Sequence, residues 1–253
     1  KDRRDIARMM AEVASALAGI RARVTAATAA AGRSSEPRLV AVSKLKPADM
    51  IQAAFDAGQR HFGENYVQEV TEKAPALPSD LQWHFIGKLQ SNKAKKLVAA
   101  VPNLACVETV DTVKLANMLN KACVAIERAE PLRVFVQVNT TDEPQKNGTT
   151  LDGAAEVAAH IHTACPSLVF AGLMTVGKLG EPAPIYFERL VKCRADVCAA
   201  LEISEADIEL SMGMSADFED AIAAGSTNVR VGSSIFGARD AAKVAARRAE
   251  AAA

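Results

Sequence analysis

A serine and then a lysine end an apolar run in the stretch Leu39–Pro47, which reads LVAVSKLKP. A nearly continuous apolar run of this kind is typical of a buried parallel strand, so Lys44 is expected at or just past the carboxyl end of that strand. A lysine in such a loop is ordinarily a solvated charge. A partly desolvated lysine loses its proton more easily, however, and can form a Schiff base with a carbonyl compound.

Two later turns place glycine and serine at the start of a predicted helix, in the segments SMGMSADFEDA and RVGSSIFGA. Helix N-termini have unpaired N–H groups and the positive end of the helix dipole, which bind phosphate readily. Gly232 allows the backbone to approach an anion closely, and Ser215, Ser233 and Ser234 add hydroxyl donors. Ser215 and Ser234 are also candidates for ordinary N-caps, but two adjacent turns of the same character favour a phosphate site.

Arg230 lies in the segment NVRVG, where it alternates with Val229 and Val231 and shares a strand face with Gly232. If that face points into the interior of a barrel, a guanidinium lies beneath the ligand. Because arginine stays protonated and only donates hydrogen bonds, it would hold a pyridine nitrogen unprotonated and make the ring a weak electron sink. The alternative is an arginine paired with a carboxylate at the barrel rim.

A Schiff-base lysine beside a phosphate site indicates one of two ligands. They are pyridoxal 5′-phosphate (PLP) and a phosphorylated carbonyl substrate of the kind used by class I aldolases. Other candidate residues follow neighbouring strands: Asn65 could donate to a ring oxygen or cap the next helix. Lys88 and Lys146 are expected at the same rim, where a lone lysine more often faces solvent.

Alternating strand-like and helix-like segments must position these residues. The strands are expected at about Leu39–Val42, Arg60–Asn65, Leu81–Gly87, Leu104–Val110, Leu132–Asn139, Leu168–Met174, Asp207–Gly213 and Asn228–Gly232. The helices are expected at about Pro47–Ala57, Tyr66–Lys73, Asn92–Ala99, Thr112–Ala129, Leu151–Ala164, Ile185–Leu201 and Ala216–Ala224, with a last helix from Ser234. Eight such units predict a single (β/α)8 barrel rather than an open doubly wound sheet. The first strand then adjoins the eighth at the carboxyl end of the barrel, which puts Lys44 beside the phosphate turns.

A long helix precedes the barrel, from about Asp5 to Ala31, and GRSSEP ends it. Its apolar residues recur at helical spacing: Ile6, Met9, Met10, Val13 and Leu17. We expect one domain over residues 1–253, made of a helix and linker (1–36), the barrel (37–240) and a C-terminal helical tail (241–253).

Composition excludes several classes of protein. The chain has 30 basic and 30 acidic residues and 49% hydrophobic content, so no global field attracts nucleic acid or an anionic membrane. Its apolar stretches are too short to span a bilayer, and the charged start KDRRDIARMM does not resemble a signal peptide. We therefore expect neither a nucleic-acid nor a membrane partner.

The cysteines and histidines predict no metal site. The five cysteines are scattered without a C-x-x-C pair, which is typical of reduced core thiols in an intracellular protein. The four histidines lack ligand spacing, and His160 and His162 are expected on a partly exposed helix face. These features favour a cytoplasmic location, and a mitochondrial or plastid one stays open because no initiator methionine is present.

Four segments carry a resemblance to a known family. VAVSKLKP, AGQRHFGENYVQE, LQWHFIGKLQSNK and LSMGMSADFEDAIAAGSTNVRVGSSIFGAR occur in this order between about Leu39 and Arg239. Together they resemble the pyridoxal phosphate homeostasis protein family, the PLP-binding relatives of the alanine racemase barrel. The resemblance implies a monomeric or loosely associated barrel of PLP fold type III.

The resemblance also implies a role for each matching residue. Lys44 matches the lysine that forms the internal aldimine, and Arg230 matches the arginine facing the pyridine nitrogen. The remaining matches are phosphate binding by Ser215, Gly232 and Ser233, and lining of the ring or pocket by Asn65, Met174 and Met212. Members commonly have threonine at the Ser233 position, which also offers a hydroxyl. Asn147 stands where the family usually has serine, which weakens any carry-over to that loop.

The family is known for maintaining the supply of PLP without an established turnover activity. We therefore expect a PLP carrier that releases the cofactor to apo-enzymes. A weak PLP-dependent amino-acid racemase is the alternative. Related racemases carry a second domain with a catalytic tyrosine, and racemisation needs an acid and a base on opposite faces of the substrate carbon. Lys44 could be one of these, but neither Tyr66 nor Tyr186 is a convincing second.

Overall fold

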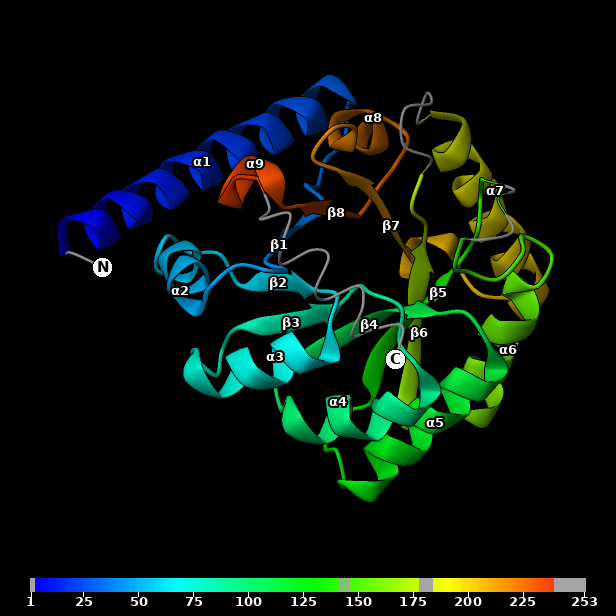
Figure 1. Cartoon of the computed structure of the whole chain (residues 1–253). Helices are drawn as coiled ribbons and strands as arrows, with labels where there is room; N and C mark the ends of the chain where they lie inside the picture. Colours follow the sequence, from blue (N-terminus) through cyan, green and yellow to red (C-terminus); the bar gives the residue numbers. More distant parts are fainter. Residues whose placement is uncertain (1–2, 142, 144–145, 178–183, 239–253) are drawn as a thin grey trace.

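The structure is a computed structural model of the chain and describes residues 3–141, 143, 146–177 and 184–238. The strands are β1 (Arg38–Val42), β2 (His61–Glu64), β3 (Gln82–Phe85), β4 (Leu104–Val110), β5 (Leu132–Gln137), β6 (Leu168–Met174), β7 (Glu209–Met214) and β8 (Asn228–Val231). Each strand pairs in parallel with its neighbours in sequence, and β8 pairs with β1, so the sheet is closed (Figure 1). The predicted (β/α)8 barrel is confirmed, and the open sheet is excluded.

Helices surround the barrel and cover its outer face (Figure 1). They are α1 (Arg3–Ala30), α2 (Ala48–Asp56), α3 (Val67–Lys73), α4 (Ala94–Ala100), α5 (Val113–Ala125), α6 (Ala154–Ala164), α7 (Pro184–Leu201), α8 (Phe218–Ala223) and α9 (Ser233–Phe236). Short 3-10 turns lie at Ala74–Ala76, Ser91–Lys93 and Glu205–Asp207. None of the helices in the described part of the chain is long and apolar enough to cross a membrane.

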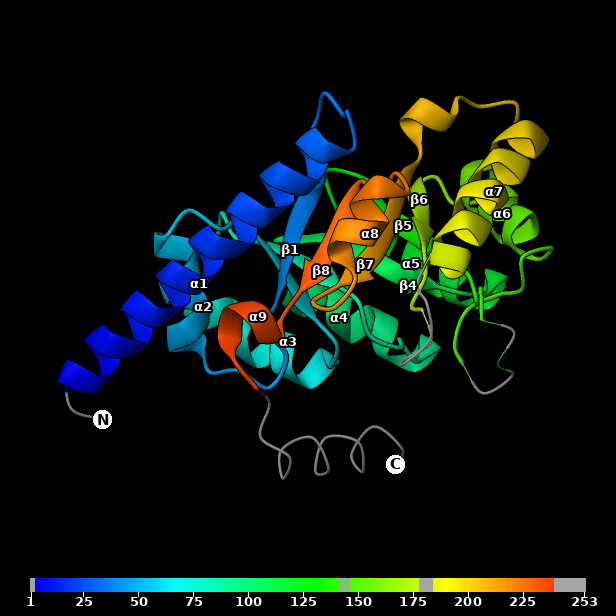
Figure 2. The same cartoon turned by 90° about the horizontal axis from the view of Figure 1, so that it is seen from above.

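The N-terminal helix α1 packs against α2, α8 and α9, as predicted for an element added outside the barrel. Its buried residues continue further along the helix than expected: Val13, Leu17, Ile20 and Val24. Met10 is exposed, because the first turns of α1 extend past the other elements (Figure 2). The apolar spacing thus predicts the helix correctly but not which of its turns is buried.

Helix α6 begins three residues later than predicted, at Ala154, and two helices end differently from the prediction. Helix α5 stops at Ala125 instead of Ala129, because Glu127 has a left-handed φ of 50° that a helix does not accommodate. The last described helix, α9, has only four residues and ends at Phe236, because the next residue, Gly237, has a φ of 74°. The predicted C-terminal helical tail, residues 241–253, lies outside the described residues.

Two apolar clusters occupy the two sides of the sheet. The larger lies between the sheet and the helices and includes Leu210, Met212, Val229 and Val231. The smaller lies inside the barrel and consists of Cys106, Phe135, Ala171 and Met174. Side chains alternate along a strand, so residues between the outward-facing valines and leucines point inward. Polar side chains therefore also lie inside the barrel, beside this small cluster, and Arg230 is one of them.

The cysteine and exposed-histidine predictions agree with the structure. All five cysteines are buried and free: Cys106, Cys123, Cys165, Cys193 and Cys198. On α6, His160 is half-buried and His162 is exposed.

Candidate functional site

The turn that carries Lys44 follows β1 and is anchored from the outer side of the sheet. Lys44 is half-buried, and the next residue, Leu45, has a left-handed φ of 64°. The backbone N–H of Leu45 donates to Glu69 Oε2 at 2.8 Å, and Lys73 Nζ donates to the carbonyl oxygen of Ser43 at 3.2 Å. These contacts fix the backbone on both sides of Lys44.

The anchors belong to a buried charged triad of two carboxylates and one ammonium. Lys73 Nζ lies 2.8 Å from Glu64 Oε1 and 2.6 Å from Glu69 Oε2. Ser43 Oγ also donates to Glu64 Oε1, at 2.6 Å. Burial raises the pKa of Glu64 and the neighbouring Glu69 raises it further, while Lys73 and Ser43 oppose this shift. Two carboxylates therefore share one cation directly beneath the lysine turn.

Gly232 brings the turn after β8 against the end of β1. A Cβ at Gly232 would lie 3.1 Å from both the Cβ and the carbonyl oxygen of Val42, which precedes Lys44 by two residues. The N–H of Gly232 donates to Ser215 Oγ at 3.2 Å, so the two glycine-serine turns are bonded to each other. The barrel thus brings Lys44 and the predicted phosphate residues to one side of the mouth.

The serines are not helix caps, because Asp217 and Gly232 hold the N-cap positions of α8 and α9. The N-cap interpretation of Ser215 and Ser234 is therefore wrong. Helix α9 begins at Ser233, and the first N–H groups of a helix have no partner within it. Among the described residues, no hydrogen bond involves the backbone N–H of Ser233 or Ser234. These N–H groups and the hydroxyls are the donors that an anion needs.

Arg230 faces the barrel interior, as its alternation with two outward-facing valines predicts, and is 4% exposed. Its Nη1 donates to Ser211 Oγ at 2.5 Å and its Nη2 donates to the carbonyl oxygen of Thr175 at 2.8 Å. In the sheet Arg230 is level with Val40 on β1, so the guanidinium belongs to the layer below Lys44 and Gly232. The alternative position for Arg230, paired with a carboxylate at the barrel rim, is wrong, because the residue lies inside the barrel.

Asn65 lies at the mouth after β2 and does not cap α3, whose N-cap position is held by Tyr66. Its Oδ1 is buried without a hydrogen-bond partner in the described part of the chain. A Cβ at Gly87 would collide with the backbone of Asn65, so the ends of β2 and β3 are in close contact. Asn65, Tyr66 and Lys88 line a cleft of about 650 Å³ at this rim. An unsatisfied amide beside a cleft is a feature of ligand sites.

Met212 is not brought together with the other predicted residues. Its side chain belongs to the core between the sheet and the helices, because it shares a strand face with Leu210 while Ser211 faces inward. Met174, by contrast, lies in the interior cluster at the end of β6. The pocket-lining role of Met212 stays a prediction.

The two rim lysines have different surroundings. Lys88 is exposed at the cleft. Lys146 is half-buried, forms an ion pair with Glu143 at 2.7 Å and donates to the carbonyl oxygen of Gly177 at 3.1 Å.

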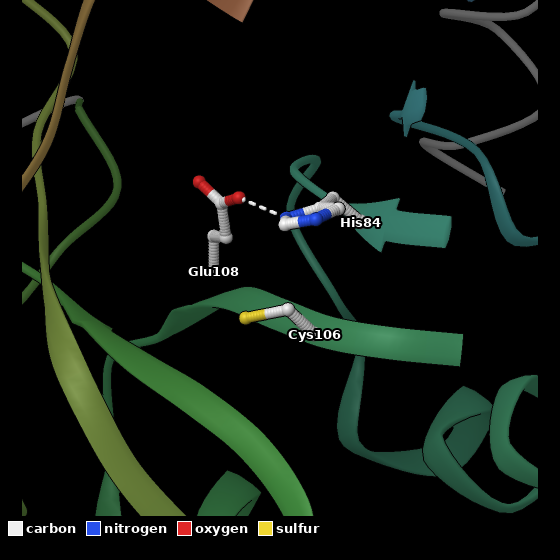
Figure 3. A group of neighbouring side chains, drawn as sticks. All are labelled: His84, Cys106 and Glu108. Atoms are coloured by element: carbon white, nitrogen blue, oxygen red, sulfur yellow. Dashed lines mark hydrogen bonds and ion pairs between the residues drawn. The ribbon is translucent and has the colours of Figure 1, made fainter. Parts of the chain in front are cut away.

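A group inside the barrel was not predicted as functional. Potential ligand atoms of His84, Cys106 and Glu108 all lie within 4.8 Å of one another (Figure 3). Burial, and then the charge of Glu108, raise the pKa of the Cys106 thiol well above its usual value, whereas a metal ligand must be a thiolate. Both Glu108 oxygens already accept hydrogen bonds. The group is a hydrogen-bonded cluster, and the absence of a metal site stays a prediction. Its signal in the sequence is a glutamate inside the apolar run LACVETV.

Known proteins resemble the chain over most of its length. The sequence model of the alanine racemase N-terminal domain matches residues 16–240. The pyridoxal phosphate homeostasis protein of Mus musculus is 51% identical over 218 residues, which cover 82% of this chain and 79% of the mouse protein. The Escherichia coli protein of the same name is 43% identical over 240 residues, which cover 92% of this chain and 100% of the relative.

A solved structure extends this comparison to three dimensions. PipY of Synechococcus elongatus, solved with PLP bound, is 34% identical and superimposes with a TM-score of 0.73. The match covers 89% of this chain and 100% of PipY. The chain therefore belongs to the pyridoxal phosphate homeostasis protein family, with a barrel of the alanine racemase N-terminal type.

Proposed function

We propose that the chain binds PLP at the carboxyl end of the barrel, with Lys44 Nζ bonded to the cofactor as a Schiff base, and acts as a PLP carrier. The names of its relatives and the PLP bound to PipY support this proposal. The observation that carries it is the contact of Gly232 with Val42, because that contact joins the lysine turn of β1 to the glycine-serine turn of β8.

The donors at this turn suit the phosphate of PLP. The hydroxyls of Ser215 and Ser233 and the free N–H groups of Ser233 and Ser234 are all donors, and Gly232 has no side chain to obstruct an anion. Among the described residues, no carboxylate forms a hydrogen bond with these groups. A phosphate dianion needs this kind of donor set.

The ring of PLP requires a partner for its pyridine nitrogen and contacts at its edge. Arg230 donates to Ser211 and Thr175, and a guanidinium has further N–H donors for a ring nitrogen above it. At the mouth, the Oδ1 atom of Asn65 is buried without a hydrogen-bond partner among the described residues. Bound PLP supplies an electron-withdrawing ring, and Arg230 would weaken that property by leaving the nitrogen unprotonated. This choice of partner disfavours transamination, which needs a strong electron sink.

A weak amino-acid racemase is the second candidate, because Tyr66 lines the same cleft as Asn65. Tyr186 does not qualify, since it is buried in α7. Incubation of the PLP-loaded protein with single-enantiomer amino acids separates the two functions. A carrier shows no loss of optical activity, whereas a racemase shows sustained loss that depends on Lys44 and falls in Tyr66→Phe.

The carrier role is tested by transfer of PLP to an apo-enzyme. The purified protein should show the absorption of a protein-bound Schiff base, which a class I aldolase would lack, and should reactivate an added apo-enzyme. Lys44→Arg keeps the positive charge but should lose the absorption band, while Lys95→Ala, an exposed lysine of α4, should keep it. An unchanged band in Lys44→Arg would show that Lys44 does not hold the cofactor.

A further inference from the structure

A chain of hydrogen bonds leads from Arg230 into the barrel interior and ends on a carboxylate. Arg230 Nη1 donates to Ser211 Oγ, and Ser211 Oγ donates to Glu108 Oε2, each at 2.5 Å. Arg230 is 4% exposed, and Ser211 and Glu108 are fully buried. A cation and an anion are therefore joined through one hydroxyl in a region without solvent.

The second oxygen of Glu108 is also bonded, which fixes the orientation of the carboxylate. Glu108 Oε1 accepts from Asn228 Nδ2 at 3.0 Å and lies 2.6 Å from His84 Nδ1 (Figure 3). Burial by itself raises the pKa of Glu108, but the hydrogen bonds of His84 and Ser211 and the charges of His84 and Arg230 outweigh it and lower the pKa to about 2. Glu108 is therefore an ionised carboxylate at neutral pH.

Two imidazoles, those of His84 and His61, lie beyond Glu108 in the barrel interior. His61 Nδ1 lies 3.0 Å from His84 Nε2. Burial, followed by the neighbouring His84 and Arg38, lowers the pKa of His61 to about 3, so His61 is neutral. The neutral His61 therefore shares one hydrogen bond with His84, and His84 shares one with Glu108.

Few other charges face Arg230. Burial lowers its pKa, and Glu108 and Asp217 oppose this effect. Asp217 holds the turn after β7, because its Oδ1 accepts from the N–H of Met214 at 2.6 Å. Glu108 is the carboxylate that the hydrogen bonds connect to the guanidinium. A buried charge without such a partner is strongly unfavourable.

We propose that Glu108 is a positioning residue for the cofactor: through Ser211 it is the counterion that stabilises the buried charge of the Arg230 guanidinium and orients it toward the pyridine nitrogen. The identity of the ligand above Arg230 rests on the proposed function. The pairing of Glu108 with Arg230 does not, because it is a property of the protein without ligand.

The pairing is tested by a double-mutant cycle on the unfolding midpoint of the cofactor-free protein. Glu108→Gln and Arg230→Gln each leave one buried charge alone, so each should lower the midpoint. The double variant removes both charges and should lose less than the sum of the two single losses. The matched control is Glu64→Gln combined with Arg230→Gln. Glu64 is equally buried but bonds Lys73 and Ser43, so this cycle should be additive. An additive Glu108–Arg230 cycle would overturn the proposal.

The positioning role is tested by PLP affinity. Glu108→Gln should weaken PLP binding on the order of tenfold or more, since one partner of a buried charged pair is lost. Glu108→Asp should regain part of that affinity, because it restores the charge. Ser211→Ala keeps both charges, is the variant to use if Glu108→Gln does not fold, and should also weaken binding. Unchanged affinity in Ser211→Ala, or equal losses in the Asp and Gln variants, would contradict the proposal.

These experiments separate the inference from the function. If the unchanged protein binds no PLP, the proposed function fails while the stability cycle still reports on the pairing. If it binds PLP and the cycle is additive, the inference alone fails. Stabilisation of the unchanged protein by Zn²⁺ that disappears in Glu108→Gln would make Glu108 a metal ligand and would also overturn the inference.

Discussion

Gly232 and Val42 are so close that a Cβ on the glycine would lie 3.1 Å from both the Cβ and the carbonyl oxygen of the valine. This contact sets the spacing between the phosphate turn and the turn that carries Lys44. Gly232→Ala should push the turns apart, weaken PLP binding and cost about 1–3 kcal/mol of stability through overpacking. PLP titration and urea unfolding measure the two effects.

The control for this variant is Gly19→Ala. Gly19 lies in α1, and nothing lies within 4 Å of its Cβ position. Alanine there should leave PLP affinity unchanged and raise stability by about 0.5–1 kcal/mol, as expected inside a helix. Equal PLP affinity in Gly232→Ala and the unchanged protein would show that the spacing is not critical.

Lys73→Met should be strongly destabilising, because it leaves the buried Glu64 and Glu69 facing each other without a cation. Removing one partner from a buried ion pair costs about 3–5 kcal/mol. Lys192 provides the comparison, since it also pairs with a carboxylate four residues away, Asp196, but on the surface. Lys192→Met should leave the stability almost unchanged, because an exposed ion pair is screened by solvent. Similar midpoints for the two variants in urea unfolding would refute the role of the triad.

Stability should decrease as the pH falls from about 6.5 to about 3, because of His61. Its pKa is lowered from 6.5 to about 3 in the folded protein, so in this range the unfolded chain binds a proton that the folded chain does not. Glu108, with its pKa lowered from 4.5 to about 2, adds a loss in the same direction between those values. The measurement is the urea midpoint as a function of pH. His61→Gln should flatten the upper part of the curve, and an unchanged slope in that variant would contradict the assignment.

Met212→Ala and Met174→Ala should behave differently, although both methionines are fully buried. Met212 packs between the sheet and the helices, so its truncation should cost about 2–5 kcal/mol without changing PLP affinity. Met174 lies inside the barrel at the end of β6, so its truncation should change PLP affinity as well. Calorimetry and PLP titration distinguish the two. A change of affinity in Met212→Ala would restore its predicted role as a pocket residue.

Local patterns explain why the barrel could be predicted from the sequence. The strands β1, β4, β5 and β6 are mostly apolar runs bounded by turn residues, and the alternation of Val229, Arg230 and Val231 places the arginine inside. The same logic places Lys44 and Gly232 at one end of the barrel. For Met212 the family resemblance implies a pocket-lining role, whereas the inward direction of Ser211 favours the opposite strand face.

Long-range pairs could not be predicted in this way. Glu108, Ser211 and Arg230 belong to three strands, and their contact depends on the closure and register of the whole sheet. The end of α5 at Ala125 depends on one left-handed residue, Glu127, which carries no strong sequence signal. A buried charge in an apolar run indicates that a partner exists, but not which residue it is.

Borohydride reduction tests most directly whether Lys44 holds the cofactor. The protein is loaded with PLP, reduced, digested and analysed by mass spectrometry. We predict that the added mass of the reduced cofactor is found on the peptide containing Lys44 and is absent from Lys44→Arg. Attachment to another lysine, such as Lys88 or Lys146, with none at Lys44, would contradict the account.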